Sequence, residues 1–281
     1  MRHLFHIFLF TQFAFSQPAV VCKHWLYGIP TGTGGGNTLI VRDIYALSND
    51  PHTKFASWIA YRVEKENIGK SEGRKWAPDP WLDPAETLEP EDYDGAPQKL
   101  KIDRGHQAPL ASFSGTKDAH ETNYLSNITP QSSELNQGAW VKIENAERKL
   151  SKSDGAVYVL TGPVYARQMQ GLPKADEPHT VPSGYWKIIY DDTLIATTLE
   201  RDRIEDSEFF YKAHLVSLPR FVVAFIFDQS TSRNESPLNH VVSVDSVEKI
   251  SGLDFFSDLP DETENAIEAQ TSKSFAERLL K

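Results

Sequence analysis

Short apolar runs separated by turn residues dominate the pattern of the chain, and most of them are rich in the β-branched and aromatic residues that favour strands. The run over 54–66 alternates apolar and polar side chains, so we expect a strand antiparallel to the one before it. Several later runs are apolar almost throughout, which is typical of buried or half-buried strands. The predicted strands cover residues 38–47, 54–66, 98–106, 123–130, 156–165, 185–191, 193–200 and 220–229.

The clearest helical pattern covers residues 133–155. Ser132 or Ser133 can cap its start, and Gly155 can end it. Its apolar stripe consists of Leu135, Ala139, Ile143, Ala146 and Leu150. The other predicted helices cover residues 244–253 and 267–281. Because the order is mostly strands with a few helices placed irregularly among them, the pattern indicates an α+β fold with a mainly antiparallel sheet.

Two segments between these elements are predicted to be loops. The glycine-rich stretch 28–37 resembles a phosphate-binding pattern only weakly, because Asn37 stands where G-x-G-x-x-G needs its last glycine. The stretch 77–97 is rich in proline and acidic residues, so we expect a long surface loop there.

The first residues of the chain have the pattern of an export signal. Arg2 precedes a short apolar run, and small residues around Ser16 favour cleavage before Gln17. The run is too short and too polar for a spanning helix, although an uncleaved anchor or a buried helix stays an alternative. We therefore expect a signal peptide over 1–16, a single domain over 17–281, and a secreted product, periplasmic or extracellular, with no membrane contact.

Composition adds limits on the kind of protein. The 281 residues are 40% hydrophobic and 24% charged, as in ordinary globular proteins. The formal net charge of −10 argues against a protein that coats nucleic acid by bulk electrostatics, but the acids concentrate in 77–97 and 245–281, so a basic face elsewhere is allowed. Cys22 is the single cysteine, which excludes an intramolecular disulfide and leaves a partly buried thiol or, less favoured, a disulfide-linked dimer.

His106 is the first candidate for chemistry, because of its neighbours in "KIDRGHQAPL". An imidazole with a pKa near ~6.5 is a usable general base when another group holds its tautomer. Arg104 lies two residues earlier on the same predicted strand and should project to the same side, where a guanidinium can bind phosphate. Asp103 should point the other way and tether the strand.

The predicted helix supplies a second set of candidate residues along one flank of its apolar stripe, namely Asn136, Trp140, Glu144 and Glu147. An amide oxygen with a nearby carboxylate suits Mg²⁺ that keeps most of its waters. The alternative is that Asn136 is simply polar near a helix start, and that Glu144 and Glu147 pair with Arg148 and Lys149 in solvent. Residue types alone leave both interpretations open.

The stretches "DRGHQAPLAS" and "NYLSNITPQSSELNQGAWVKIENAERKL" closely resemble the signature of the DNA/RNA non-specific endonuclease family, in particular its secreted Serratia-type nucleases. Asn136 follows His106 by thirty residues, which fits that family's ββα-metal (His-Me finger) motif. Further similarity includes "GRKW", "LTGPVYAR" and "PHTVPSGYWKIIY", and the resemblance runs from about residue 22 to 260. It implies a ββα-metal nuclease fold whose antiparallel sheet is flanked by helices.

The resemblance also implies roles for individual residues. His106 would be the general base that deprotonates water, and Asn136 the direct ligand of Mg²⁺, with Mn²⁺ as a substitute. The other implied residues are Arg104 and Arg74 as catalytic and phosphate-binding arginines, Glu144 as a catalytic group that holds metal-bound waters, Asn127 as a catalytic support, and Asn123 and Arg148 as substrate-binding residues.

The implied activity is Mg²⁺-dependent hydrolysis of DNA and RNA to products with 5′-phosphate ends. DNA and RNA are thus the expected partners, and a homodimer and an inhibitor protein are further candidates. Two alternatives remain: a catalytically silent, secreted nucleic-acid-binding module of the same fold, and a phosphatase or phosphodiesterase for small phosphate esters.

Overall fold

The computed structural model describes residues 22–70, 73–191, 194–204 and 208–281. The expected signal peptide over 1–16 therefore lies outside the described residues. Within the described ranges, the helices are all too short or too polar to cross a membrane.

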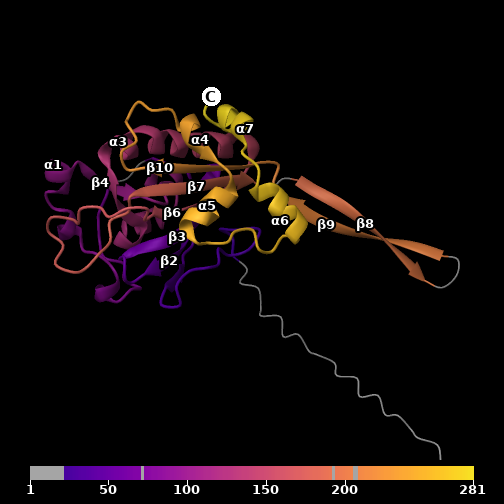
Figure 1. Cartoon of the computed structure of the whole chain (residues 1–281), viewed down its shortest axis with the longest axis horizontal. Coiled ribbons are helices and arrows are strands. Elements are labelled where there is room, and N and C mark those ends of the chain that lie inside the picture. Colours follow the sequence, from indigo (N-terminus) through magenta and orange to yellow (C-terminus); the bar gives the residue numbers. More distant parts are fainter. Residues whose placement is uncertain (1–21, 71–72, 192–193, 205–207) are drawn as a thin grey trace, which may run out of the picture.

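A seven-stranded sheet forms the centre of the molecule, and each neighbouring pair in it is antiparallel (Figure 1). This confirms the α+β class expected from the sequence. In spatial order the strands are β1 (Thr38–Val41), β2 (Ala46–Asp50), β3 (Phe55–Val63), β6 (Val157–Val164), β7 (Gly184–Asp191), β10 (Val222–Asp228) and β11 (Val241–Val242).

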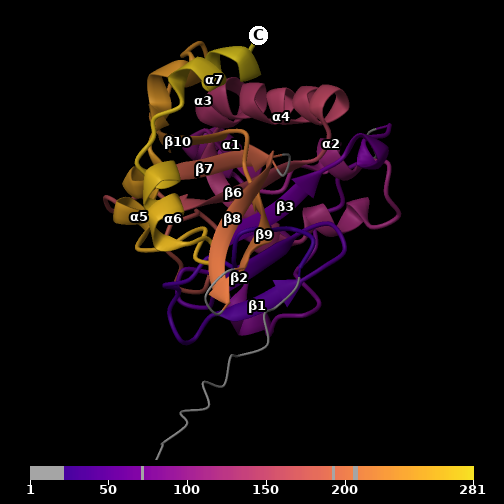
Figure 2. The same ribbon diagram turned by 90° about the vertical axis from the view of Figure 1, so that its right-hand side faces the viewer.

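Helices cover both faces of this sheet (Figure 2). Successive strand residues point to opposite faces, so Ile189 of β7 packs in the core under α4 (Val141–Asp154) and α7 (Lys273–Leu279). Its neighbours Ile188 and Tyr190 pack in the core on the other face, with α5 (Val244–Ser251). All eight residues of β6 and of β7 are buried as a result, which explains their nearly unbroken apolar sequences.

The segment that carries the predicted site forms a hairpin followed by a helix. The hairpin consists of β4 (Ile102–His106) and β5 (Ile128–Ser132), which pair antiparallel outside the central sheet. The helix begins with α3 (Ser133–Leu135), where the Ser132 hydroxyl accepts a hydrogen bond from the Leu135 N–H, and continues through the π-helical turn η6 (Asn136–Trp140) into α4. This order is the ββα arrangement that the sequence predicted.

The π-helical turn was not predicted, because the helical pattern runs through it unbroken. Gly138 has φ −110° and ψ −109° inside the turn. A Cβ at this position would lie 2.6 Å from the Arg233 carbonyl oxygen, so the kink depends on a close approach by a distant loop. Such turns are frequent at functional sites.

Other elements differ from the predictions in their limits. The predicted strand 38–47 is two strands, β1 and β2, joined by a turn in which the Arg42 N–H donates to the Tyr45 carbonyl at 2.8 Å. The predicted strand 98–106 begins with α1 (Ala96–Leu100), and the predicted helix 267–281 is replaced by α6 (Asp261–Glu268) and α7. The remaining short helices are η1 (Lys65–Asn67), η2 (Pro84–Glu86), η3 (Pro90–Tyr93), α2 (Leu110–Phe113), η4 (Ala119–Asn123), η5 (Leu125–Asn127) and η8 (Pro237–His240).

The acidic stretch 77–97 is more ordered than a plain surface loop. It contains η2 and η3, and Leu88 and Tyr93 are buried in a small core beside the β4–β5 hairpin. Its apolar residues therefore anchor it, while most of its acids stay at the surface.

A long hairpin projects from the body of the molecule (Figure 1). It consists of β8 (Leu194–Ile204) and β9 (Glu208–Leu218), which pair antiparallel as a separate two-stranded sheet. The sequence predicted only the first part of β8.

A buried ion pair ties α4 to the sheet. The Lys187 ammonium group on β7 lies 3.0 Å from a carboxylate oxygen of Glu147 on α4, and neither side chain is exposed. The Tyr61 hydroxyl on β3 accepts from Lys187 at 2.7 Å and donates to Glu147 at 2.9 Å. The Lys187 ammonium also lies 4.5 Å from the centre of the Trp140 ring. Glu147 is thus not the solvent-exposed helix residue of the alternative interpretation.

Glu147→Gln should lower the free energy of unfolding by about 3 kcal/mol, because it leaves the buried Lys187 charge without the carboxylate that contacts it. Urea unfolding followed by circular dichroism measures the change. Glu134→Gln is the matched control, since the Glu134–Arg233 pair is about half exposed and should contribute less than about 1 kcal/mol. Equal losses in the two variants would contradict the importance of the buried pair.

Candidate active site

A cavity of about 590 Å³ lies between the β4–β5 hairpin and the start of the long helix. It brings together most of the residues that the sequence singled out. The predicted site residues on its wall are Arg74, Arg104, His106, Asn136, Glu144 and Arg148. Residues far apart in the sequence therefore share one polar cavity, as the ββα prediction requires.

His106 ends β4 and reaches the cavity with 9% of its surface exposed. Its Nε2 lies 3.2 Å from the side-chain oxygen of Asn123, which can only accept, so the proton sits on Nε2 and Nδ1 keeps its lone pair. The Trp76 ring lies 5.2 Å from the imidazole, centre to centre. Burial lowers the pKa of His106 to about 4, against the opposing hydrogen bond to Asn123. The imidazole is therefore neutral at pH 7, the form that a general base needs.

Asn123 and Asn127 are not on the cavity wall. Asn123 is 1% exposed and lies behind His106. This position suits a residue that orients the imidazole, and it does not suit the contact with substrate that the resemblance implies. Asn127 is fully buried. Its side chain accepts from the Ala108 N–H at 2.8 Å and donates to the carbonyls of Ala108 and Thr122. Asn127 therefore fixes the chain after His106, and its burial leaves no direct contact with a reacting group.

Asn136 is oriented by Asp103 of β4. The amide nitrogen of Asn136 donates to Asp103 Oδ2 at 2.8 Å, which leaves the amide oxygen Oδ1 as the free ligand atom. Asp103 also accepts from Gln137 at 2.8 Å and from Ser133 at 2.6 Å. Asp103 thus tethers the strand to the helix start, as expected. Contrary to the expectation that it points the other way, Asp103 also lines the cavity.

The donor set of the cavity fits a hard divalent cation. It offers one amide oxygen at Asn136 and carboxylates at Asp103 and Glu144, and oxygen ligands of this kind suit Mg²⁺ or Mn²⁺ that keeps part of its water shell. With Asp103 already accepting from three side chains, Asn136 is the residue placed to bind the ion directly.

Three arginines line the cavity in different ways. Arg104 lies over the rings of Tyr93 at 5.2 Å and Trp76 at 5.7 Å, and it donates to the Pro90 carbonyl. Arg74 is exposed, and it reaches the cavity from the segment before Trp76. Guanidinium groups from separate segments can contact several oxygens of one phosphate group.

Arg148 completes this set from α4. It donates to the Ser112 hydroxyl at 3.3 Å and to the Asn145 side-chain oxygen at 2.6 Å. These contacts differ from the helix ion pair that the alternative interpretation offered.

Glu144 faces the cavity from α4 and is only partly exposed. Burial raises the pKa of its carboxyl group to about 7, while the Lys187 charge lowers it and Glu147 raises it. A carboxyl group poised near neutrality at this position can accept or donate a proton, unlike an acid in a solvated helix pair.

The structure adds two points that sequence reasoning missed. Trp76 contacts both His106 and Arg104, and its place in "GRKW" beside Arg74 was the available signal. Gly105 is needed because of β5, and not to leave room between the side chains of Arg104 and His106. A Cβ at this position would lie 2.5 Å from the Gln131 side-chain oxygen on β5. The close approach of the two hairpin strands thus requires glycine.

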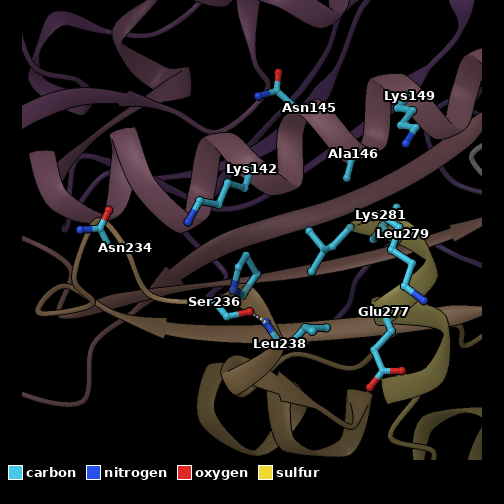
Figure 3. A pocket seen from close by; sticks show the side chains of 12 residues that line it. Lys142, Asn145, Ala146, Lys149, Asn234, Ser236, Leu238, Glu277, Leu279 and Lys281 are labelled. Atoms are coloured by element: carbon cyan, nitrogen blue, oxygen red, sulfur yellow. Dashed lines mark hydrogen bonds between the residues drawn. The ribbon is translucent and has the colours of Figure 1, made fainter.

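A larger cavity of about 720 Å³ lies on the other side of α4 (Figure 3). Lys142, Ala146 and Lys149 of α4 meet Leu238 and Leu279 there. None of the residues lining this cavity is a histidine, and the site residues expected from the sequence are all elsewhere. The helix therefore separates a polar cavity suited to phosphate chemistry from a mixed apolar and basic one.

Comparisons with known proteins agree with this geometry. The family model of the DNA/RNA non-specific endonucleases matches residues 26–262. The chain is 43% identical to a nuclease of Serratia marcescens over 245 residues, which is 86% of this chain and 84% of that protein. It is 27% identical to a nuclease of Nostoc sp. over 262 residues, which is 89% of this chain and 86% of the relative.

A solved structure shares the fold. The crystal structure of the EndoG/EndoGI complex contains a chain that aligns with a TM-score of 0.64 and 22% identity, over 84% of this chain and 91% of that chain. At this identity the likeness concerns the fold alone, and it agrees with the antiparallel sheet and flanking helices. The family model matches most of the chain, and the Serratia marcescens nuclease is 43% identical to it. The chain therefore belongs to the DNA/RNA non-specific endonuclease family.

Proposed function

We propose that this endonuclease hydrolyses phosphodiester bonds of DNA and RNA with a bound divalent cation, Mg²⁺ or Mn²⁺, and with His106 as the general base. The observation that carries the proposal is that His106 and the free amide oxygen of Asn136 line one cavity, with Arg74, Arg104 and Arg148 around them. The proposal is finer than family membership because it assigns the metal ligand and the base.

The arginines bind the substrate through its phosphate group. Phosphate oxygens are common to every nucleotide, so contacts of Arg74, Arg104 and Arg148 with them carry no sequence or sugar information. Their separate origins let them approach the phosphate from different sides. This accounts for action on both DNA and RNA.

His106 provides the base for the attacking water. Asn123 holds the proton on Nε2, so Nδ1 takes a proton from a water molecule as its oxygen attacks the phosphorus. The 3′ oxygen leaves in line and takes a proton from solvent water, so the products carry 5′-phosphate and 3′-hydroxyl ends. A cation on Asn136 Oδ1 would supply positive charge to the phosphate and to the leaving oxygen, and Glu144 is placed to hydrogen-bond waters around that cation.

We also propose export of the protein, on the pattern of residues 1–16. Export would remove a non-specific nuclease from the cell's own nucleic acids. An inhibitor protein is a further proposed partner, since the structural neighbour was solved as the EndoG/EndoGI complex.

The purified protein should degrade both plasmid DNA and RNA in the presence of Mg²⁺, and a chelator should stop the reaction, because Asn136 then has no cation to hold. Gel electrophoresis of both substrates, with and without chelator, measures this. Cleavage of a chromogenic phosphate monoester alone would favour the phosphatase alternative, and no cleavage at all would favour the silent module.

His106→Ala serves as the control in the same assay. Loss of a general base should lower kcat by about 100- to 10,000-fold while the circular dichroism spectrum stays unchanged. Near wild-type cleavage by this variant would show that another group is the base or that a contaminant is active.

The acid limb of the pH profile should fall in two steps. As the pH drops, Glu144 with its pKa of about 7 gains a proton first, and a bound cation, which favours the carboxylate, moves this step below 7. His106 gains its proton only near pH 4, where the base is lost. Measurement of kcat/KM from pH 4 to 9 tests this, and Glu144→Gln should remove the upper step alone.

Asp103→Ala should weaken metal activation by about 10- to 100-fold, because the Asn136 amide loses the partner that orients it. The Mg²⁺ concentration for half-maximal activity measures the effect. Gln137→Ala is the matched control, since Gln137 donates to the same carboxylate but is exposed. An equal effect in both variants would argue against orientation through Asp103.

A further inference from the structure

A second cavity, of about 720 Å³, lies on the other side of α4 from the candidate active site (Figure 3). Lys142 and Lys149 of α4 line it together with Lys281. Glu277 is the one acidic side chain among the described residues on its wall. The formal net charge of the chain is −10, so a wall with three cationic side chains and one acid departs from the acidity of the whole protein. This cavity therefore suits an anionic ligand.

The charges of these lysines are not neutralised by carboxylates. Within the described part of the chain, none of the ion pairs includes Lys142, Lys149 or Lys281. Lys142 Nζ donates to the Glu235 carbonyl at 3.3 Å, while the Glu235 carboxylate lies 3.1 Å from His240 Nε2. All three lysines are exposed, so an anionic ligand can reach them from solvent.

The surface of α4 joins this cavity to the candidate active site. Asn145 lines the second cavity and accepts from Arg148 at 2.6 Å, and Arg148 lines the candidate active-site cavity. Figure 3 shows Lys142 and Lys149 extending into the second cavity, whereas Asn145 points to the other side of the helix. Between residues 141 and 152 the exposed side chains are all basic or amide, namely Lys142, Asn145, Lys149 and Lys152. A chain of phosphates can thus pass from one cavity to the other without meeting an exposed acid of α4.

The floor of the second cavity is apolar. Ala146 and Leu279 are buried in the core that α4 forms with the sheet, and Leu238 and Leu280 pack against that core. All four residues also line the cavity. The faces of nucleobases pack on apolar side chains when the strand is single, whereas in a duplex they are stacked on one another. Lysines above an apolar floor therefore fit the phosphates and the bases of a single strand.

The two cavities are close enough for one strand to occupy both. An α-helix with its side chains is about 10 Å across, and a stacked strand advances about 3.4 Å per nucleotide. About three nucleotides therefore cross α4 from one cavity to the other.

We propose that the second cavity binds a single-stranded flank of the nucleic-acid substrate, about three nucleotides away from the bond that is cut. Lys142 and Lys149 contact its phosphates, and the leucines of the floor contact its bases. The inference rests on the proposed function, because it extends the same substrate beyond the candidate active site. An acidic peptide would meet the same cations, but the continuity through Arg148 favours the strand that the active site already holds. The subsite makes long single strands better substrates than short ones and adds no sequence preference through its phosphate contacts.

Cleavage of a trinucleotide and of a sixteen-nucleotide single strand of DNA tests the inference, because the trinucleotide has at most two nucleotides on either side of a bond and cannot reach the second cavity. The double variant Lys142→Gln, Lys149→Gln should lower kcat/KM for the long strand about fivefold and leave the value for the trinucleotide unchanged. Binding of the long strand is measured by fluorescence anisotropy in the presence of a chelator, which prevents cleavage. The slope of the logarithm of the binding constant against the logarithm of the salt concentration should become less steep by about 1.4 for two lost phosphate contacts.

The double variant Lys23→Gln, Lys249→Gln is the matched control, since both lysines are exposed and line neither cavity. It removes the same charge and should change neither value. Glu277→Gln should act in the opposite direction and tighten binding of the long strand, because it removes the acid from the cavity wall.

The subsite is wrong if the two double variants lose the same activity, or if the trinucleotide and the long strand are affected equally. A sixteen-base-pair duplex should lose less than the single strand, and an equal loss would contradict the assignment to unpaired bases. Failure of the unmodified protein to cleave either strand would instead overturn the proposed function, and the binding measured with chelator would still decide whether the subsite exists.

Discussion

The ion pair between Lys187 and Glu147 sets the position of the helix that carries half of the candidate active site. Because Glu147 is held on the sheet by Lys187 and Tyr61, the rotation of α4 about its own axis is fixed. Glu144 and Arg148 lie within one turn of Glu147, and both line the candidate active-site cavity. A charged contact in the core thus sets the direction of side chains that meet a phosphate group in the proposed mechanism. It also accounts for the burial of a lysine in the middle of a central strand.

Asp103 provides the second constraint, at the other end of the helix. It joins the strand that carries His106 to Asn136, so the proposed base and the proposed metal ligand are fixed relative to each other. The π-helical turn behind Asn136 depends on Gly138 and on the approach of the loop at Arg233. Local backbone geometry, a short polar network and a distant loop therefore act together to place one amide oxygen.

Much of this arrangement could be predicted from the sequence, because its signals are local. The apolar runs predict the buried strands, and the motif around His106 with its spacing to Asn136 predicts the ββα unit. What escaped prediction depends on distant partners. Arg42 looks like one polar residue within a strand, yet it lies in the turn between β1 and β2 and pairs with Asp79, thirty-seven residues away. The ion pair of Lys187 with Glu147 on α4 and the burial of Asn123 behind His106 are invisible without the fold.

The partner of His106 is a neutral amide, not a carboxylate. In the proposed mechanism, the imidazole becomes positively charged when it takes a proton from water, and among the residues that the structure describes no anion hydrogen-bonds to the ring to stabilise that charge. The buried surroundings lower the pKa of the ring to about 4, so the charged form releases its proton to neutral solvent once the products leave. The same shielding that keeps the resting histidine neutral therefore also restores it for the next round of cleavage.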